Sequence, residues 1–517
     1  LPSIFLSSVS FVDIAIFQFR LSLLRKKLLY VLVELIMSFG KTVVCFGAKI
    51  TCLIFSFVFC CSLSLFSQNL SDARISLIIT DIASDTTIAD IDSRTPMTPA
   101  SITKLITTAT ALGDDFRFTT EILIDGNISD STLHGNLIVR AVGDPTIGSS
   151  YFSDRDFLSR WSDAICRYVP AGISRIEGDI VADLSLFDSV AIPAGWSSPD
   201  IGNYYAAGVY GLSFYDHIVA VTFHTSKSGT KPSIVGIYPY IKDFTVVNRL
   251  TAKRGAGDNS FFSGVPYSLQ RTITGSLEAN SSKFIVKADN GNPPLVLLQA
   301  FRDTLQQRGI SLLGNIRISF DKYYPRHNHL VPLFVAFSPP LADIIRITNV
   351  YSNNMFAESL AKYIALFSTD RASFDRGISV IKSFWSKRGI DIAHLNMLDG
   401  SGLTVSNTFP AALLNDLLIY MYRHSANYDV FLRSLPVAGV NGTVRNFLKY
   451  TPLAGKAHLK SGSIGGVQCY AGYICKGEKT YSVVVMVNGF RGKRRNIVAS
   501  IEKLILNTIE NYENPSP

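Results

Sequence analysis

The segment TPASITKLITTATAL, residues 98–112, places a serine and a lysine three positions apart at the start of an apolar-striped stretch. Apolar residues recur at positions 102, 105, 106, 109 and 112, which predicts a helix that begins after Pro99. One helical turn puts the Lys104 amine over the Ser101 Oγ. A lysine kept partly neutral by burial and by neighbouring positive charge can accept the serine proton. Ser101 and Lys104 are therefore a candidate nucleophile and base, against the alternative of two polar residues at the rim of a helix.

The S-x-x-K pattern by itself carries little information, because it occurs seven times in the chain. Ser101 alone follows a Pro-Ala start and opens a strongly amphipathic helix. Ser228 lies in a Gly/Ser/Pro loop, and Ser359 and Ser379 fall inside helical patterns, where a hydroxyl is usually a surface or back-bonding group. The seven starting positions are Ser38, Ser101, Ser228, Ser319, Ser359, Ser379 and Ser500.

Two motifs further along the chain add context to Ser101. The stretch YSNN supplies Ser352 and Asn354 just before a helical pattern, and HLKSGSIGGV supplies Lys460, Ser461 and Gly462 before a strand-like run. A cleft is predicted in which Ser101 lies on the floor and the strand after Lys460 forms one wall. Ser352 and Asn354 are expected opposite that wall.

The order of the predicted elements indicates a mixed α/β fold. A strand at 73–82 precedes the helix after Pro99, and a strand-rich interval runs from about 116 to 325. Helical patterns, two more strands and a closing helix follow. We expect the two ends of the chain to rejoin in one catalytic domain, an antiparallel sheet flanked by helices. Its predicted ranges are 68–115 and 330–517, with 116–329 as a β-rich insertion.

The N-terminal residues are typical of a targeting segment. Met37 is the first methionine, so residues 1–36 are interpreted as translated sequence upstream of the mature protein. Residues 37–67 show the basic, apolar and small-residue order of a signal peptide. This order predicts export to the periplasm or cell envelope. A retained anchor helix remains an alternative, because about 17 apolar residues is the lower limit for spanning a bilayer.

Charge and cysteine content exclude some classes of protein. Of the net charge of +9, four units lie in residues 1–67, and the remainder shows no basic block in the sequence, so nucleic acid is not expected as a partner. A mildly basic surface suits an acidic polymer or a membrane equally well, which leaves peripheral membrane association open. Cys469 and Cys475 lie six apart in a strand pattern, too far apart for a disulfide. No metal site or other cofactor is predicted.

The three motifs, in this order, resemble the signatures of the penicillin-recognising serine enzymes. More of the chain, from about residue 73 to 495, resembles the D-alanyl-D-alanine carboxypeptidase/endopeptidase type of low-molecular-mass penicillin-binding protein. This resemblance implies a β-lactamase/transpeptidase-like catalytic domain with a large insertion between the first and second motifs. The stretches that carry it are GNLIVRAVGDPTIGS, IEGDIVADLSLFD, GWSSPDIGNYYAA, SPPLADIIRITNVYSNNMFAESLAK, DGSGLTVSN and SLPVAGVNGT.

The resemblance also implies a role for each motif residue. Ser101 would form the acyl-enzyme with Lys104 as its base, and Ser352 and Asn354 would relay a proton to the leaving amine and hold the substrate backbone. Lys460 and Ser461 would bind the terminal carboxylate, and the backbone N–H groups of Ser101 and Ser463 would bind the oxyanion. Gly462, between Ser461 and Ser463, is also implied in substrate binding. Asp200 and Tyr205 would contact the stem-peptide side chain.

Two positions, Ser461 and Val405, depart from the family pattern. For a third, Glu358, the helical pattern of its segment predicts whether the side chain is exposed. Ser461 replaces the usual threonine and keeps the hydroxyl. Val405 stands where the family often has an arginine. This difference argues against recognition of a second carboxylate on the substrate side chain. Glu358 is expected to face solvent, so no dedicated glutamate base for fast deacylation is predicted.

The expected function is a serine-type D-Ala-D-Ala carboxypeptidase or endopeptidase. Its expected partners are peptidoglycan stem peptides and β-lactams, which would acylate Ser101. A β-lactamase and a non-catalytic β-lactam-sensing or wall-binding protein are the alternatives. The sequence does not rank carboxypeptidase against endopeptidase activity.

Overall fold

The computed structural model describes residues 73–154, 156–168, 172–321 and 330–515, all within one compact unit, Asn69–Pro517. The predicted upstream segment 1–36 and the predicted signal peptide 37–67 lie outside the described residues. Among the residues that are described, no helix combines the length and the apolar character needed to cross a bilayer.

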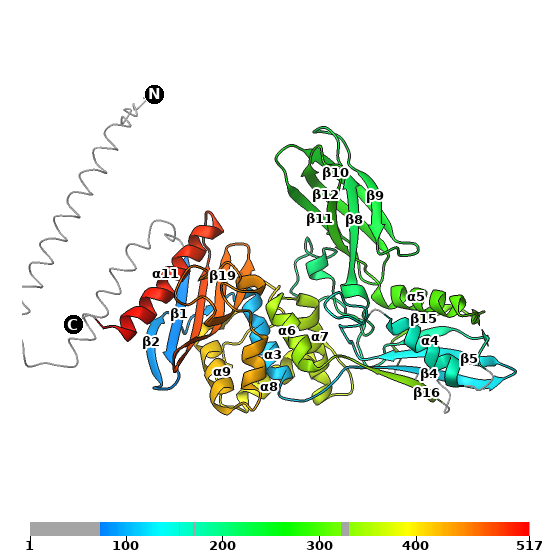
Figure 1. The fold of residues 1–517 in the computed structure, drawn as a ribbon, viewed down its shortest axis with the longest axis horizontal. Coiled ribbons are helices and arrows are strands. Elements are labelled where there is room, and N and C mark those ends of the chain that lie inside the picture. The colour runs from blue at the N-terminus through cyan, green and yellow to red at the C-terminus, as the bar shows by residue number, and fades with distance from the viewer. Residues whose placement is uncertain (1–72, 155, 169–171, 322–329, 516–517) are drawn as a thin grey trace, which may run out of the picture. The chain divides into compact units, whose positions relative to one another are not determined.

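A five-stranded antiparallel sheet joins the two ends of the chain, as the sequence predicted. Its first strand, β1, pairs on one side with β2 and on the other with β20, where Leu77 lies opposite Val485. In Figure 1 the blue strands accordingly lie beside the orange ones, with α11 across one face of the sheet. The elements are β1 (Arg74–Asp81), β2 (Thr86–Ile91), β18 (Ala457–Ile464), β19 (Val467–Lys476), β20 (Lys479–Asn488) and α11 (Arg494–Glu513).

Helices cover the other face of this sheet and carry much of one apolar core. The helix predicted after Pro99 begins as a 3₁₀ turn, η1, and continues as α3. A hydrogen bond of 2.8 Å from the Trp385 indole to the Thr110 hydroxyl ties α8 to α3. The elements are η1 (Ala100–Thr103), α3 (Lys104–Ala111), α6 (Leu341–Val350), α7 (Asn354–Ile364), η4 (Ala365–Phe367), α8 (Phe374–Ser386), α9 (Ala411–His424), α10 (Tyr428–Ser434) and η5 (Gly442–Val444), with a short ribbon of β3 (Pro96–Met97) and β17 (Phe409–Pro410).

A seven-stranded sheet with two helices lies within the interval between the first two motifs (Figure 1). It has its own apolar core, in which the Trp161 ring of α4 meets the Phe301 ring of α5 edge to face. Its strand β16 pairs with β4, so this sheet includes residues 330–337, which were predicted in the catalytic domain. The elements are β4 (Thr119–Ser129), β5 (Thr132–Ala141), α4 (Phe157–Tyr168), β6 (Arg175–Ile176), β7 (Ile180–Asp183), α5 (Pro293–Gln307), β14 (Ser311–Leu312), β15 (Ile316–Ser319) and β16 (Leu330–Phe337).

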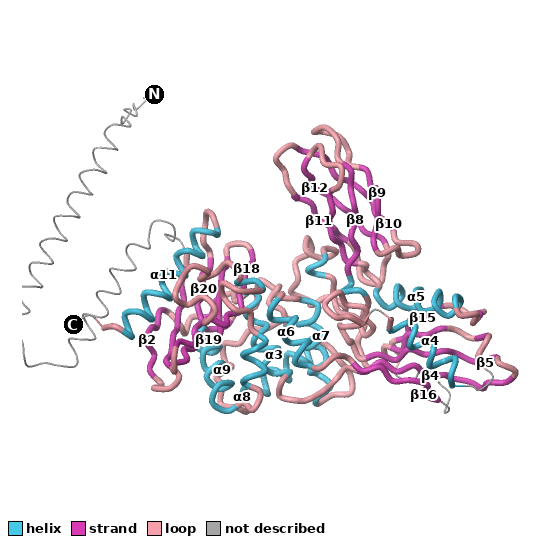
Figure 2. Tube along the Cα trace, in the orientation of Figure 1, coloured by secondary structure: helices cyan, strands magenta, loops and turns pink. Residues whose placement is uncertain are grey.

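Residues 218–289 form a lobe of two three-stranded sheets, seen as a separate group of strands in Figure 2. One sheet has the order β13-β8-β9 and the other β10-β12-β11. Two single turns, η2 and η3, precede it. The exact domain borders stay a prediction. The elements are η2 (Tyr204–Ala206), η3 (Tyr215–His217), β8 (Ile218–His224), β9 (Ser233–Tyr238), β10 (Thr245–Lys253), β11 (Asp258–Ser263), β12 (Gln270–Glu278) and β13 (Phe284–Asp289).

Candidate active site

Ser101 lies on the η1 turn that leads into α3, half-buried at the edge of the five-stranded sheet. The preceding residue, Ala100, is fully buried and has a φ of 48°, a backbone conformation that alanine rarely adopts. Such a strained turn must be stabilised by its surroundings, and strain of this kind gathers at functional sites. The turn brings the Ser101 Oγ within 3.1 Å of the Lys104 Nζ.

Lys104 is completely buried, and its amine is held by oxygens from three parts of the chain. Besides Ser101, Nζ donates to Asn354 Oδ1 at 2.6 Å and to the Ser401 carbonyl at 2.7 Å. Burial lowers the pKa of Lys104 to about 7, against the opposing attraction of the Glu358 and Asp399 carboxylates. At neutral pH a substantial fraction of this amine is therefore uncharged and able to accept a proton.

Ser352 and Lys460 form a second serine–lysine pair beside the first. The Lys460 Nζ donates to Ser352 Oγ at 2.9 Å and to the Ser461 carbonyl at 2.7 Å. Burial, together with the positive charge of Lys104, holds the pKa of Lys460 well below its usual value. Ser352 itself has a φ of 56°, in the left-handed region, just before the first residues of α7.

Strand β18 forms one wall of the site, as predicted. A Cβ atom at Gly462 would lie 3.0 Å from the Ser101 amide nitrogen and 2.5 Å from the Pro99 carbonyl, so only glycine allows the strand to approach η1 this closely. The Ser461 hydroxyl donates to Thr443 Oγ1 at 2.7 Å. The Ser463 hydroxyl donates to Gln468 on β19, also at 2.7 Å.

Asn354 connects Lys104 to the segment around Tyr205. Its amide nitrogen donates to the Tyr205 carbonyl at 2.8 Å, while its oxygen accepts from Lys104. The Tyr205 hydroxyl donates to Asp200 Oδ1, also at 2.8 Å. Asn203 fixes this segment by donating to the Asp200 and Phe262 carbonyls and accepting from the Phe262 N–H. The structure thus brings together all three motifs and the segment of Asp200 and Tyr205.

Known proteins are similar to this chain over most of its length. The model of the D-Ala-D-Ala carboxypeptidase 3 (S13) family matches residues 63–505. The chain belongs to the S13 family. The family and fold class predicted from the sequence are therefore confirmed, and with them the enzyme class, a serine-type D-Ala-D-Ala carboxypeptidase.

Two curated relatives and one solved structure illustrate the similarity. D-alanyl-D-alanine carboxypeptidase DacB of Haemophilus influenzae is 27% identical over 442 residues, 81% of this chain and 86% of the relative. D-alanyl-D-alanine carboxypeptidase of an Actinomadura species is 26% identical over 449 residues, 82% of this chain and 79% of the relative. The crystal structure of penicillin binding protein 4 (dacB) from H. influenzae has a TM-score of 0.75 at 25% identity and covers 86% of this chain and 99% of its own.

The prediction that Glu358 faces solvent is wrong for this S13 chain. Glu358 is completely buried, and its two oxygens accept the Gly400 and Ser401 N–H groups at 2.9 and 2.7 Å. Burial, with the nearby Asp399 carboxylate, raises the pKa of Glu358 to about 8. The signal was present in the sequence, because Asn354 and Glu358 are four apart on one helix and must share a face.

The segment around Ser401 was recognised as a family stretch, but not as part of the site. Buried Asp399 accepts from the Gly402 and Thr404 N–H groups, each at 2.7 Å. These bonds and those to Glu358 shape the turn that presents the Ser401 carbonyl to Lys104. Val405 follows in this loop; its side chain is 58% exposed and carries no charge.

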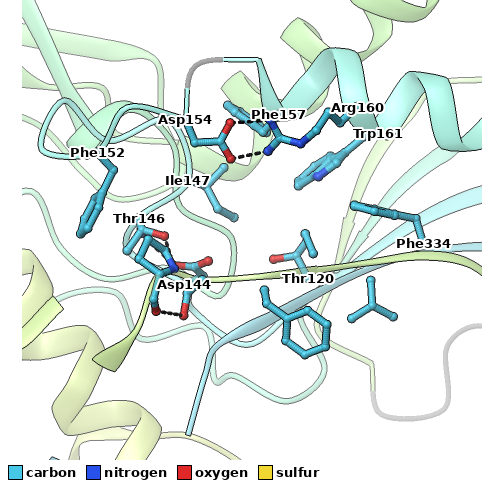
Figure 3. Close-up of a pocket in the computed structure, with 16 residues that line it drawn as sticks. Thr120, Asp144, Thr146, Ile147, Phe152, Asp154, Phe157, Arg160, Trp161 and Phe334 are labelled. Atoms are coloured by element: carbon cyan, nitrogen blue, oxygen red, sulfur yellow. Dashed lines mark hydrogen bonds and ion pairs between the residues drawn. The ribbon is translucent and has the colours of Figure 1, made fainter. Parts of the chain in front are cut away.

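A separate pocket of about 350 Å³ lies between α4, β16 and the segment after β5 (Figure 3). Phe157, Trp161 and Phe334 contribute rings to it, and Arg160 pairs with Asp154 at its rim. Buried Asp144 accepts from the Thr146 N–H and hydroxyl at 2.8 and 2.7 Å. Its lining contains none of the ten predicted site residues, all of which are described, so the pocket is distinct from the serine–lysine site.

Proposed function

We propose that this S13 enzyme cleaves the D-Ala-D-Ala end, or a D-amino-acid cross-link, of peptidoglycan stem peptides through an ester on Ser101. The observation that carries the proposal is the 3.1 Å contact between Ser101 Oγ and a completely buried Lys104 amine whose pKa is about 7. A base with a pKa near the working pH combines the right protonation state with adequate basicity.

The two serine–lysine pairs support a division of labour in acylation. The Ser101 Oγ attacks the carbonyl carbon of the penultimate residue and passes its proton to Lys104. The C–N bond then breaks, and the leaving amine receives a proton from Lys460 through the Ser352 hydroxyl. The backbone N–H groups of Ser101 and Ser463 would stabilise the oxyanion, each by about 3 to 4 kcal/mol.

Deacylation requires water to attack the Ser101 ester and return a proton to the serine oxygen. The proton that Lys104 gained in acylation would first pass to Lys460, which gave its own to the leaving amine. The neutral Lys104 amine, 3.1 Å from the Ser101 Oγ, can then accept the proton of that water. Both Glu358 oxygens accept backbone N–H groups, which argues against a role for this carboxylate as the water-activating base of a β-lactamase. We therefore favour a peptidase that β-lactams block as slowly released esters.

Substrate contacts follow from the walls of the site. Lys460 and Ser461 on β18 would bind the terminal carboxylate, and Asn354 would hold the substrate backbone. Asp200 and Tyr205 would contact the stem-peptide side chain, a role supported by the bond from Asn354 to the Tyr205 carbonyl. Val405 offers no charge for a second carboxylate on that side chain. The protein would act outside the cytoplasm, in the periplasm, where its substrate is found.

The test is acylation by a labelled penicillin. The purified protein should incorporate label at one site, and Ser101→Ala should abolish incorporation, because the ester oxygen is gone. Hydrolysis of a short D-Ala-D-Ala peptide, measured on the same preparations, separates a peptidase from a non-catalytic sensor. Label retained after Ser101→Ala would remove the assigned nucleophile, and acylation without peptide turnover would favour the sensor.

A further inference from the structure

One outer face of the lobe 218–289 exposes a row of aromatic and cationic side chains. Lys287 of β13 and Tyr238 of β9 both pair with Ala220 of β8, so the three residues lie side by side on one face. The Tyr238 side chain is 79% exposed, and Lys287 is also exposed. The side chain of Ala220, which lies between them, is a single methyl group and projects less than either neighbour. Ile285, 49% exposed, lies in the adjacent row of the same face.

This surface, which we call the docking face (Tyr204, Tyr238, Ile285 and Lys287), is continuous with the active site. The Lys287 ammonium lies 5.9 Å from the centroid of the Tyr204 ring. That ring meets the Tyr205 ring edge to face at 5.5 Å. The Tyr205 carbonyl in turn accepts from Asn354 beside Lys104. The docking face is therefore linked to the Ser101 site through the adjacent residues Tyr204 and Tyr205.

The charge of the lobe favours an anionic ligand. Residues 218–289 contain nine Lys and Arg but only four Asp and Glu, an excess of five positive charges in a chain whose net charge is +9. One of the cations, Arg271, is buried against Asp289 and so does not alter the balance at the surface. These charges lie in one contiguous stretch of the sequence that folds into one lobe, where they attract anions over a Debye length.

We propose that the docking face binds the part of an anionic glycan-peptide strand that lies beyond the bond to be cleaved. This inference rests on the proposed function and extends it from a short peptide to a polymer. Tyrosine offers a flat apolar ring with a polar edge, which suits sugar rings and peptide planes, and Lys287 suits a free carboxylate. We favour the polymer over a lipid surface because the docking face is linked to the Ser101 site through Tyr204 and Tyr205.

The test measures binding of Ser101→Ala protein to insoluble peptidoglycan by co-sedimentation, so that turnover does not remove the polymer. Adding Lys287→Glu or Tyr238→Ala should weaken binding by about three- to fivefold, the effect of one exposed ion pair or ring contact. Lys253→Glu is the charge-matched control, because Lys253 is exposed on β10 of the other sheet. It should weaken binding by less than about twofold.

Equal loss in Lys253→Glu and Lys287→Glu would overturn the proposal in favour of diffuse attraction to the lobe. Unchanged binding in both face variants would overturn it outright. Binding of the parent protein to phosphatidylglycerol vesicles, lost with Lys287→Glu while peptidoglycan binding persists, would assign the face to a membrane instead. Penicillin labelling of the same variants with Ser101 intact reports the proposed function separately, since it requires no polymer.

Discussion

The Lys104 amine has no exposed surface and contacts three oxygens, a setting in which the charged form loses the solvation that water would provide. Its position follows from local geometry, because Ser101 and Lys104 are one helical turn apart. Its basicity is a property of the folded protein, since the carboxylates that oppose the effect of burial come from α7 and the loop after α8.

Glu358→Gln should slow acylation and alter its pH dependence. An amide accepts with one oxygen only, so its NH₂ group would face the N–H of Gly400 or Ser401, and the Ser401 carbonyl would shift from Lys104. We expect an acylation rate about 10- to 100-fold lower. Loss of the carboxylate also removes an attraction that raises the pKa of Lys104, so the rise of the rate with pH should move to lower pH.

The measurement is the acylation rate with a chromogenic β-lactam from about pH 5 to 9, a range that brackets the Lys104 pKa. Glu502→Gln is the matched control, because Glu502 also accepts a backbone N–H, from Leu448. A pH profile that does not move after Glu358→Gln would show that this carboxylate does not influence the lysine.

Sequence reasoning recovered the residues whose relation is local and missed those whose relation is tertiary. Ser101 and Lys104 are linked by helical spacing. The order of the motifs predicted that Ser352 and Lys460 lie close to them. The burial of Glu358 depends on the loop at 399–402, which folds over α7 from more than forty residues away. Helical periodicity gives the face of a residue, but does not reveal what covers it.

At the scale of single elements, close packing of α7 and α8 depends on one glycine. A Cβ atom at Gly377 would lie 1.9 Å from the Ala361 carbonyl, too close for any side chain. Gly377→Ala should therefore separate the two helices and lower the free energy of unfolding by about 1–3 kcal/mol. Urea unfolding measures this loss.

Gly465→Ala provides the control for Gly377→Ala, since a Cβ there would meet nothing within 4 Å. It should change the free energy of unfolding by less than about 0.5 kcal/mol. Equal stability of the two variants would mean that α7 and α8 can separate at no cost.

Strong periodicity predicted α7, α8, α9 and α11, whereas α4 and α5 lie in an interval interpreted as strand-rich. The α5 sequence begins PPLVLLQAF, and a short apolar run of this kind is compatible with a strand or a buried helix. Its Asn292 cap and Pro293 start were the distinguishing signals. The order of strands in the sheets required the structure, because pairing between distant segments leaves no local pattern.

At the scale of the whole molecule, buried polar bonds join the segment 188–196 to α7 and to the loop after α8. The completely buried Lys362 of α7 donates to Asp188 at 2.6 Å and to the Val190 carbonyl at 2.8 Å. Trp196 donates to the buried Asp399 at 2.9 Å. The same loop that positions Ser401 therefore also contacts the inserted segment.

Asp188→Asn should destabilise the protein, because Lys362 would remain buried without its charged partner. We expect a loss of about 3 kcal/mol in the free energy of unfolding, measured by urea denaturation. Asp85→Asn, which breaks the exposed pair with Arg423, should cost less than about 1 kcal/mol. Similar losses of unfolding free energy in both variants would show that the buried pair stabilises the protein no more than the exposed pair.

The pairing of β1 with β20 has a consequence for timing. The ribosome releases the Ser101 turn long before β20, the strand that closes the sheet beside β1. For part of its synthesis the growing chain therefore carries Ser101 without the Lys460 strand beside it. We expect a chain whose synthesis stops before Lys479 to be inactive, because without β20 the sheet cannot hold the Lys460 strand beside the Ser101 turn.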